Sequence, residues 1–187
     1  MIRAFLDTCV LFKPLLCDTL LSIAEDDVYR PLWSGDVLEE LRRNLVRCGV
    51  PARAVEHRLE QMRVHFPGAE VAGYEDLIRG MANHHKDRHV VAAAVRGNAE
   101  VIVTENLRDF PKAALECYDV TALHQDEFLL DLHELAPGAV FRALTRQVSR
   151  YRRDPRSVED LLIGLGGAGN GCPQFAKVCH FDRFDGV

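Results

Sequence analysis

Apolar residues fill most of the first six positions of the chain, and this run ends on an acid. Residues 2–6 read Ile-Arg-Ala-Phe-Leu, and Asp7 follows them. A mostly apolar run of this length is typical of a strand buried on both faces, as in the centre of a parallel sheet. Ligands bind beyond the carboxyl ends of the strands in open α/β sheets. Asp7 is therefore either a functional acid at the rim of a sheet or the cap of the next helix, with Thr8 helping.

A second strand with the same surroundings comes later in the chain. Residues 101–104 read Val-Ile-Val-Thr, and a polar loop with Asn106 and Asp109 follows. Two further strands are predicted at residues 28–33, where Pro31 argues against a central, fully paired position, and at residues 117–120. Strands and helices alternate up to about residue 124, which predicts an α/β fold with a central parallel sheet and right-handed crossovers.

Apolar residues at spacings of three and four predict the helices between these strands. Ser34 reads as the N-cap of a helix whose apolar stripe runs from Leu38 to Leu45. Either Glu39 or Glu40 of this helix can point along the rim of the sheet. Other helices are predicted within residues 9–25, 52–65 and 74–82.

A polar cluster opens an alanine-rich helix that Gly97 closes. Asp87 stands in the first turn of this helix, where the helix dipole and free backbone N–H groups favour a carboxylate whatever its function. Three histidines flank it, His84, His85 and His89. These histidines either approach a substrate phosphate or are exposed polar neighbours without a role.

The chain changes character from Gln125 onward. Helices are predicted within residues 128–132, 140–148 and 161–165, so residues 125–187 are expected to form a small helical extension of a domain at residues 1–124. A basic stretch in this extension is either a binding surface or a solvated face; its members are Arg142, Arg146, Arg150, Arg152 and Arg153. Cys172, Cys179 and His180 lack the spacing and the fourth ligand of a zinc site.

Composition limits the possible functions. The chain has 187 residues and a net charge of -5, so nucleic acid would have to bind through a local basic face. Its six cysteines form no Cys-x-x-Cys pair and no secretory leader pattern is visible, so we expect reduced thiols and a cytoplasmic location. No apolar run approaches the ~20 residues that a membrane-spanning helix needs.

Oxygen-bearing side chains fall at positions that can converge on one rim of the predicted sheet. Carboxylates gathered there would repel one another unless a divalent cation neutralised them. Oxygen ligands suit Mg²⁺ or Mn²⁺, which can activate water for the hydrolysis of a phosphodiester. The residues concerned are Asp7, Glu40, Asp87, Asn106 and Asp109.

Four sequence blocks, in this order, resemble the PIN-domain family and most closely its VapC toxin ribonucleases. The blocks are Phe5-Leu6-Asp7-Thr8, a strand ending in Asp; Ser34 to Leu41, whose Ser-x-x-hydrophobic-hydrophobic-x-Glu-Leu pattern selects Glu40 over Glu39; Asp87 to Ala94, an Asp that opens a helix of small residues; and Val101 to Phe110, a strand followed by Thr-x-Asn and Asp-Phe. The tail resembles, more loosely, the helical C-terminal extension of a longer VapC-like subgroup, so its basic stretch either contacts RNA or an antitoxin or is a solvated face.

This resemblance implies a PIN-like three-layer sandwich with a central parallel sheet, plus the helical extension. It implies a Mg²⁺- or Mn²⁺-dependent endoribonuclease that hydrolyses RNA, acts as the toxin of a toxin–antitoxin pair, and binds a small antitoxin and a second copy of itself. On the matching positions it implies Asp7, Glu40 and Asp87 as metal ligands, Asn106 and Asp109 as further site residues, and Thr8 and Thr104 as residues that orient carboxylates or waters.

Two positions depart from the family's pattern. Cys9 stands where the family often has Asn or Ser, which would weaken a hydrogen bond behind the site. Asn106 stands where many members carry a fourth acid, which lowers the charge of the site and weakens the case for a second metal.

Other functions remain possible from the sequence. An aspartyl-phosphate phosphatase would need a second Asp where Cys9 stands, so this function is disfavoured. A flap-type nuclease would carry more acids and a helical clamp. A PIN-like module that binds RNA or protein without cutting is the main alternative, and the retained acids Asp7, Glu40 and Asp87 argue against it.

Overall fold

The computed structural model describes residues 1–182, which form two compact units. The first unit contains residues 2–12 and 30–123 and holds the sheet. The second contains Met1, residues 13–29 and the chain from His124 onward. The boundary between residues 124 and 125 stays a prediction, and residues 183–187 of the predicted extension lie outside the described residues.

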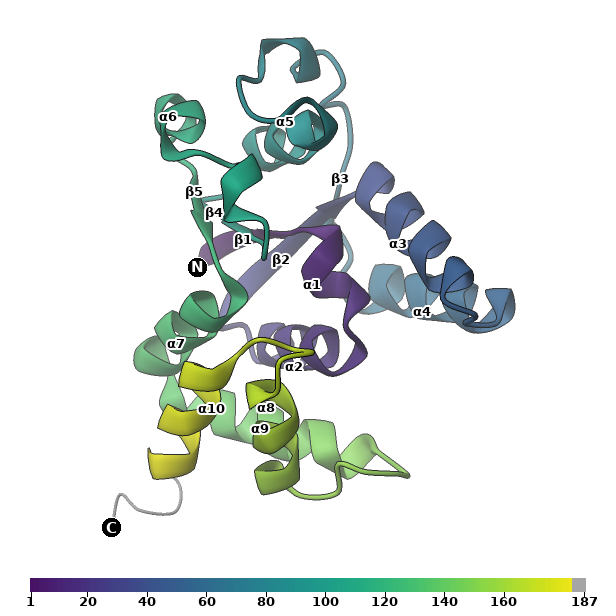
Figure 1. The fold of residues 1–187 in the computed structure, drawn as a ribbon, viewed down its shortest axis with the longest axis vertical. Helices are drawn as coiled ribbons and strands as arrows, with labels where there is room; N and C mark the ends of the chain where they lie inside the picture. Colours follow the sequence, from purple (N-terminus) through teal and green to yellow (C-terminus); the bar gives the residue numbers. More distant parts are fainter. Residues whose placement is uncertain (183–187) are drawn as a thin grey trace. The chain divides into compact units, whose positions relative to one another are not determined.

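A five-stranded parallel sheet with the order β3-β2-β1-β4-β5 forms the base of the first unit (Figure 1). Its strands are β1 (Ile2–Leu6), β2 (Tyr29–Ser34), β3 (Glu70–Val71), β4 (Val101–Val103) and β5 (Thr121–Leu123). Leu6 pairs with Val103, and Val103 pairs with Leu123. The carboxyl ends of β1, β4 and β5 are therefore level, which confirms the predicted parallel sheet and brings Asp7 beside Thr104.

Helices flank this sheet in the first unit, as predicted for the α/β fold. They are α1 (Thr8–Phe12), α3 (Gly35–Arg47), α4 (Ala52–His65), α5 (Arg88–Arg96) and α6 (Lys112–Leu115), with 3-10 helices η1 (Ile78–Gly80), η2 (His85–Asp87), η3 (Leu107–Asp109) and η4 (Glu116–Tyr118). The alanine-rich α5 packs on β1, β3 and β4 with residues 90–94 buried. Close packing also needs Gly97, because a Cβ there would lie 2.9 Å from Val71.

The helix that carries Glu40 begins as the sequence predicts. The Ser34 side chain accepts a 3.2 Å hydrogen bond from the backbone N–H of Val37, which satisfies one free donor of the first turn of α3. Leu38, Leu41 and Leu45 are buried on one face. This face packs on α1 and α4, and its position fixes where Glu40 lies.

Three local predictions were wrong. The strand expected at residues 117–120 is the 3-10 helix η4, because Asp119 adopts a left-handed conformation (φ 55°) and the strand can begin only beyond it. The helix expected over residues 74–82 is reduced to η1. The first helix breaks at Lys13, because Pro14 starts a new helix, α2 (Pro14–Ala24).

Pro31 lies in an interior strand, although a proline argues against that position. The strand β3 pairs only with Trp33 and Ser34 of β2, and the N–H of Trp33 donates to the carbonyl of Ala69. The nitrogen of Pro31 points to the same side as that of Trp33, since alternate residues of a strand share a side. The pairing with β3 begins only at Trp33, so Pro31 lies outside it and its missing N–H removes no hydrogen bond from that pairing.

The second unit is helical, as predicted for the tail. It contains α2, α7 (Gln125–Leu135), α8 (Pro137–Arg150), α9 (Val158–Gly166) and α10 (Pro173–His180). Helix α2 packs on α8 and α9, while α10 packs on α7 and α9. None of the helices within residues 1–182 has the length and apolar character needed to cross a membrane.

The arginines of α8 are engaged inside the second unit. Arg146 bonds Glu25 at 3.1 Å and also reaches Asp26 and the carbonyl of Ser22. Arg150 bonds both carboxylate oxygens of Glu25. These two guanidinium groups therefore hold α8 against the end of α2. Arg146 and Arg150 thus have a structural contact besides the solvated or binding face expected from the sequence.

Candidate active site

Asp7 lies directly after β1 and is almost fully buried, with 7% of its surface exposed. Its Oδ2 accepts hydrogen bonds from the hydroxyl of Thr104 at 2.7 Å and from the thiol of Cys9 at 3.3 Å. Its Oδ1 accepts the backbone N–H of Thr8 at 2.7 Å. Burial raises the pKa of Asp7, these hydrogen bonds lower it, and the nearby charge of Asp87 raises it further, with a net rise.

Thr8 connects two of the predicted ligands. While its backbone N–H bonds Asp7, its hydroxyl donates a 2.9 Å hydrogen bond to Oε2 of Glu40. Glu39, the alternative acid on the same helix, is exposed and forms an ion pair with Arg42 instead. The Asp7 carboxylate also accepts the first N–H of α1, so it makes the capping contact that the sequence allowed.

Asp87 lies at the start of α5, yet its side chain caps no backbone N–H group there. Its Oδ2 lies 3.4 Å from Nδ1 of His84. Burial raises the pKa of Asp87, as does the charge of Asp109, whereas His84 and His89 lower it, and the net change is a rise. The helix-dipole account of Asp87 therefore does not explain its position by itself.

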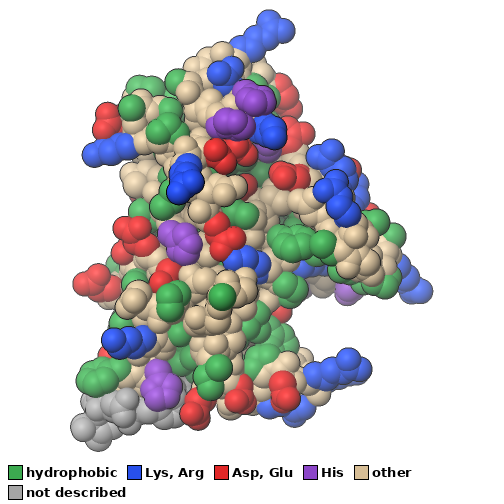
Figure 2. All heavy atoms as spheres, in the orientation of Figure 1, with side chains coloured by type: hydrophobic (Ala, Val, Ile, Leu, Met, Phe, Trp, Pro, Cys, Tyr) green, Lys and Arg blue, Asp and Glu red, His purple; other side chains and the backbone are tan. Residues whose placement is uncertain are grey.

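His84, Asp87 and Asp109 form a compact group of possible ligands, whose donor atoms all lie within 4.8 Å of one another. In Figure 2, red carboxylates lie directly beside purple histidines on the upper part of the visible face. His84 is placed more closely against an acid than the sequence indicated. The repeated histidines beside Asp87 were the available signal, but sequence alone could not say which one faces the carboxylate.

Two further predicted residues, Thr104 and Asn106, differ in whether their side chains form hydrogen bonds. Thr104 is fully buried and, besides bonding Asp7, accepts the backbone N–H of Asn106 at 3.1 Å. The Asn106 side chain is exposed and caps no backbone N–H group of η3. Asn106 is thus fixed through its backbone, and its amide is free to face solvent or a ligand.

Cys9 has a defined place behind the site. Its thiol contacts Asp7 and Thr104 and accepts the backbone N–H of Glu105 at 3.3 Å. Burial, and then the charge of Asp7, raises the pKa of this thiol to about 12. The thiol is therefore neutral and donates a hydrogen bond to Asp7. Cys9 stands at the position where the resemblance led us to expect Asn or Ser.

The donor set fits a divalent cation. Within residues 1–182, no lysine or arginine forms an ion pair with Asp7, Glu40 or Asp109. A buried carboxylate without a cationic partner is costly, because burial disfavours its charged form. Carboxylate oxygens together with an imidazole are ligands that divalent metals accept. His84, Asp87 and Asp109 could hold such an ion as they lie, whereas, among the described residues, Asp7 and Glu40 lie outside the group whose donor atoms are all within 4.8 Å of one another.

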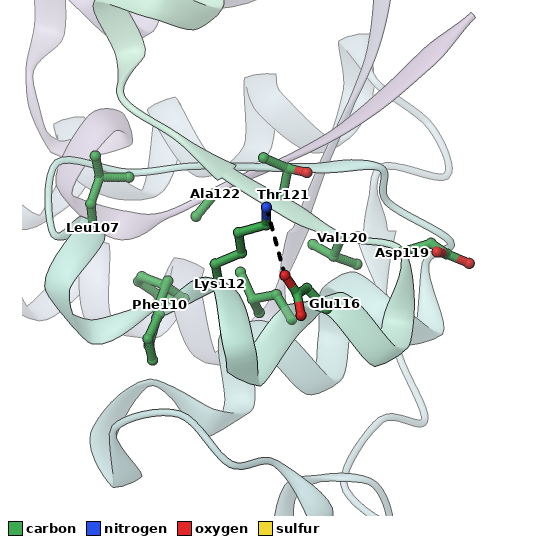
Figure 3. A pocket seen from close by; sticks show the side chains of 10 residues that line it. Leu107, Phe110, Lys112, Glu116, Asp119, Val120, Thr121 and Ala122 are labelled. Carbon is green, nitrogen blue, oxygen red and sulfur yellow. Dashed lines mark ion pairs between the residues drawn. The ribbon is translucent and has the colours of Figure 1, made fainter.

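A cavity beside the sheet is a different feature. A cavity of about 520 Å³ lies next to the edge strand β5 and α6, lined mainly by Phe110, Leu115 and Val120. In Figure 3, Lys112 points toward Glu116, which follows it by one helical turn, and their charged atoms form an ion pair at 3.6 Å. Neither Asp7, Glu40, Asp87 nor Asp109 is among the residues that line this cavity.

Cys172 and Cys179 of the second unit are buried and form no disulfide within the described residues. In the part of the chain that the structure describes, the group of His84, Asp87 and Asp109 meets the distance criterion for three ligands, and no group with these cysteines does.

Comparison with known proteins gives three results. Residues 3–108 match the family model of the PIN domain, and residues 125–180 match that of the VapC50 C-terminal domain. A 104-residue stretch is 50% identical to the Mycobacterium tuberculosis protein named "Putative ribonuclease VapC50". The stretch covers 56% of this chain and 60% of that relative. No solved structure matches the chain. Since the PIN-domain model covers more than half of the sequence, the chain belongs to the PIN-domain family.

Proposed function

We propose that the chain is a divalent-metal-dependent endoribonuclease, the toxin of a VapBC-type toxin–antitoxin pair. The main support is the convergence of acids from three elements. Asp7 after β1 and Glu40 on α3 share Thr8 as a hydrogen-bond donor, and Asp87 at the start of α5 is close enough to raise the pKa of Asp7. The name of the M. tuberculosis relative, a ribonuclease, supports the substrate class.

The protein's own residues would bind and orient the reacting groups. Thr104, Cys9 and the N–H of Thr8 hold the Asp7 carboxylate in one orientation, and the Thr8 hydroxyl does the same for Glu40. Asp7, Glu40 and Asp87 would bind a Mg²⁺ or Mn²⁺ ion, which would activate water and stabilise negative charge on the phosphodiester. Asn106 and Asp109 lie beside these ligands, where they could position a water or the RNA.

The partners and location follow from the same proposal. A small antitoxin would cover the acidic site, two copies of the chain would associate, and the protein would act in the cytoplasm. The VapC50-type match of residues 125–180 supports a toxin of this subgroup. The main alternative is a PIN-like module that holds RNA or a partner without cutting it.

The test compares two adjacent acids. Purified wild-type protein is incubated with RNA in Mg²⁺, in Mn²⁺ and in a chelator, beside Glu40→Gln and Glu39→Gln. Glu40→Gln should lose more than about a hundredfold in cleavage rate, because a metal ligand is removed. Glu39→Gln should retain the wild-type rate, since Glu39 is exposed and paired with Arg42.

Product chemistry separates the protein from a contaminating ribonuclease. Water rather than the ribose 2′-hydroxyl is the proposed nucleophile, so the products should lack 2′,3′-cyclic phosphate ends. RNA that binds but stays intact with wild-type protein in both metals would support the non-catalytic module. Equal cleavage by wild type and Glu40→Gln would exclude the proposed site.

A further inference from the structure

The group of His84, Asp87 and Asp109 is held together by the backbone as well as by its side chains. The N–H of His84 donates to the carbonyl of Asp109 at 3.4 Å, and the N–H of Asp87 donates to the carbonyl of His84 at 2.9 Å. The segment before α5 is thereby joined to the loop after β4. The imidazole of His84 and the two carboxylates meet because of this join.

The group of His84, Asp87 and Asp109 is more exposed to solvent than the Asp7 carboxylate. The His84 side chain is 43% exposed, whereas Asp7 is buried and both its oxygens already accept hydrogen bonds. Asp87 interacts electrostatically with both Asp7 and Asp109. It is therefore the residue shared between the buried acid and the outer group.

Two neighbouring side chains have buried polar atoms that no protein group within residues 1–182 satisfies. Asn83 is 4% exposed, yet both its side-chain polar atoms lack a hydrogen-bond partner within residues 1–182, and so does the buried Nδ1 of His89. Buried polar atoms in proteins are normally satisfied by protein, water or an ion. Asn83 and His89 therefore offer polar atoms next to His84 and near Asp87 that can hydrogen-bond water or a hydrated ion.

We propose that His84 is a nitrogen ligand that binds a divalent cation together with Asp87 and Asp109, so that this site prefers Mn²⁺ or Co²⁺ over Mg²⁺. The inference rests on the proposed function only in assigning Asp87 to the metal site. It adds a ligand of a different chemical class to the acids on which that function depends.

The preference follows from ligand chemistry. Mg²⁺ favours oxygen ligands in regular octahedral geometry and gives up its waters reluctantly. Imidazole binds Co²⁺ and other transition metals well, and affinity rises from Mn²⁺ to Co²⁺ in the usual order of divalent ions. An imidazole in the site thus favours the transition metals, while the carboxylates serve all three ions. His85, whose ring centroid lies 4.5 Å from that of His84, is outside the ligand group and provides a matched control.

The experiment measures cation binding without RNA. Metal-free wild-type protein, His84→Gln and His85→Gln are titrated with Co²⁺ by visible absorption, and with Mn²⁺ by the electron paramagnetic resonance of the free ion; Mg²⁺ is then used as a competitor. His84→Gln should weaken Co²⁺ and Mn²⁺ binding by about tenfold or more. Its Mg²⁺ affinity should change much less, and the nitrogen-dependent part of the Co²⁺ spectrum should disappear. His85→Gln should behave as wild type.

Two results would overturn the inference: unchanged Co²⁺ binding in His84→Gln, or equal weakening of Mg²⁺ and Mn²⁺. A parallel RNA cleavage assay separates this inference from the proposed function. Cleavage by wild type with unaltered metal binding in His84→Gln defeats the inference alone. Selective loss of Co²⁺ and Mn²⁺ binding in a protein that cuts no RNA supports the inference and defeats the proposed function.

Discussion

The hydroxyl of Thr8 donates a 2.9 Å hydrogen bond to Oε2 of Glu40, and so joins the residue after the first buried acid to an acid on another element. The same residue bonds Asp7 through its backbone. Only the contact with Glu40 depends on the side chain, so the two contacts can be separated by mutation.

Thr8→Val should lower RNA cleavage and metal affinity by about ten- to a hundredfold, because Glu40 loses the donor that orients it. Valine has nearly the shape of threonine and Thr8 is buried, so the fold should be kept. Thr8→Ser restores the hydroxyl and should recover most of the activity. Cleavage rates and Mn²⁺ titrations of the two variants provide the test; an active Thr8→Val would show that the bridge is dispensable.

Asp7→Asn should abolish cleavage and yet stabilise the metal-free protein. The pKa of Asp7 is raised in the folded state above its ordinary value of 3.8, chiefly by burial. Stability is therefore lost as pH rises from that value through the folded-state pKa, and the full penalty is present at neutral pH. Removing the charge should raise stability by about 1 kcal/mol, or roughly 2–4 °C in Tm.

Thermal melts in chelator measure this effect directly. The gain of Asp7→Asn over wild type should disappear in acid, where both side chains are neutral. Adding Mn²⁺ should raise the Tm of wild type more than that of Asp7→Asn, since a ligand that binds only the folded state stabilises it. A variant that melts below wild type at neutral pH in chelator would contradict a buried, destabilising carboxylate.

The buried thiol of Cys179 predicts a loss of stability in alkali. Burial, and then the charge of Asp182, raises its pKa from 9.0 to about 12. The unfolded chain loses this proton first, so the contribution is intact below pH 9.0 and is lost as pH rises toward 12. The slope should reach at most about 1.4 kcal/mol per pH unit.

Urea unfolding at several pH values compares wild type with Cys179→Ala and with Cys48→Ala, whose cysteine is exposed. Cys179→Ala should start less stable, because it leaves a small cavity, and should lose less stability in alkali. Cys48→Ala should follow the wild-type curve. Parallel curves for wild type and Cys179→Ala would mean that this thiol does not carry the effect.

Patterns that depend on local chemistry were predictable from the sequence. The buried strand before Asp7 and the Ser34 cap before Glu40 are local features, and the structure contains both. The alternation of strands and helices also predicted a parallel sheet whose strands end on one rim. The register itself, with Leu6 opposite Val103, is known only from the structure.

Features that depend on tertiary context were not. The extent of β3 decides whether Pro31 is tolerated, and no residue near Pro31 reveals it. The left-handed Asp119 shifts the last strand by a few residues in a segment where the apolar pattern fits either register. The pairing of His84 with Asp87 depends on a backbone hydrogen bond to Asp109, which lies in a distant loop.

Two arginines on successive turns of α8 should differ in their importance for stability. Arg146 is 30% exposed and bonds Glu25, Asp26 and the carbonyl of Ser22, whereas Arg142 is 69% exposed and lies 3.7 Å from Asp26. Arg146→Ala leaves partly buried acceptors without their donor and should cost about 1–3 kcal/mol. Arg142→Ala removes a weak surface pair and should cost less than about 0.5 kcal/mol.

Urea unfolding of the two variants, followed by circular dichroism, gives these differences, and RNA binding measured in parallel tests the other role of the basic stretch. If α8 holds the second unit together through Arg146, Arg146→Ala is destabilised in low and high salt, because the bond to the Ser22 carbonyl does not depend on an opposite charge. Equal and small losses for both variants would show that the contacts to the end of α2 contribute little. Weaker RNA binding by a stably folded Arg142→Ala would instead assign the exposed arginine to the substrate.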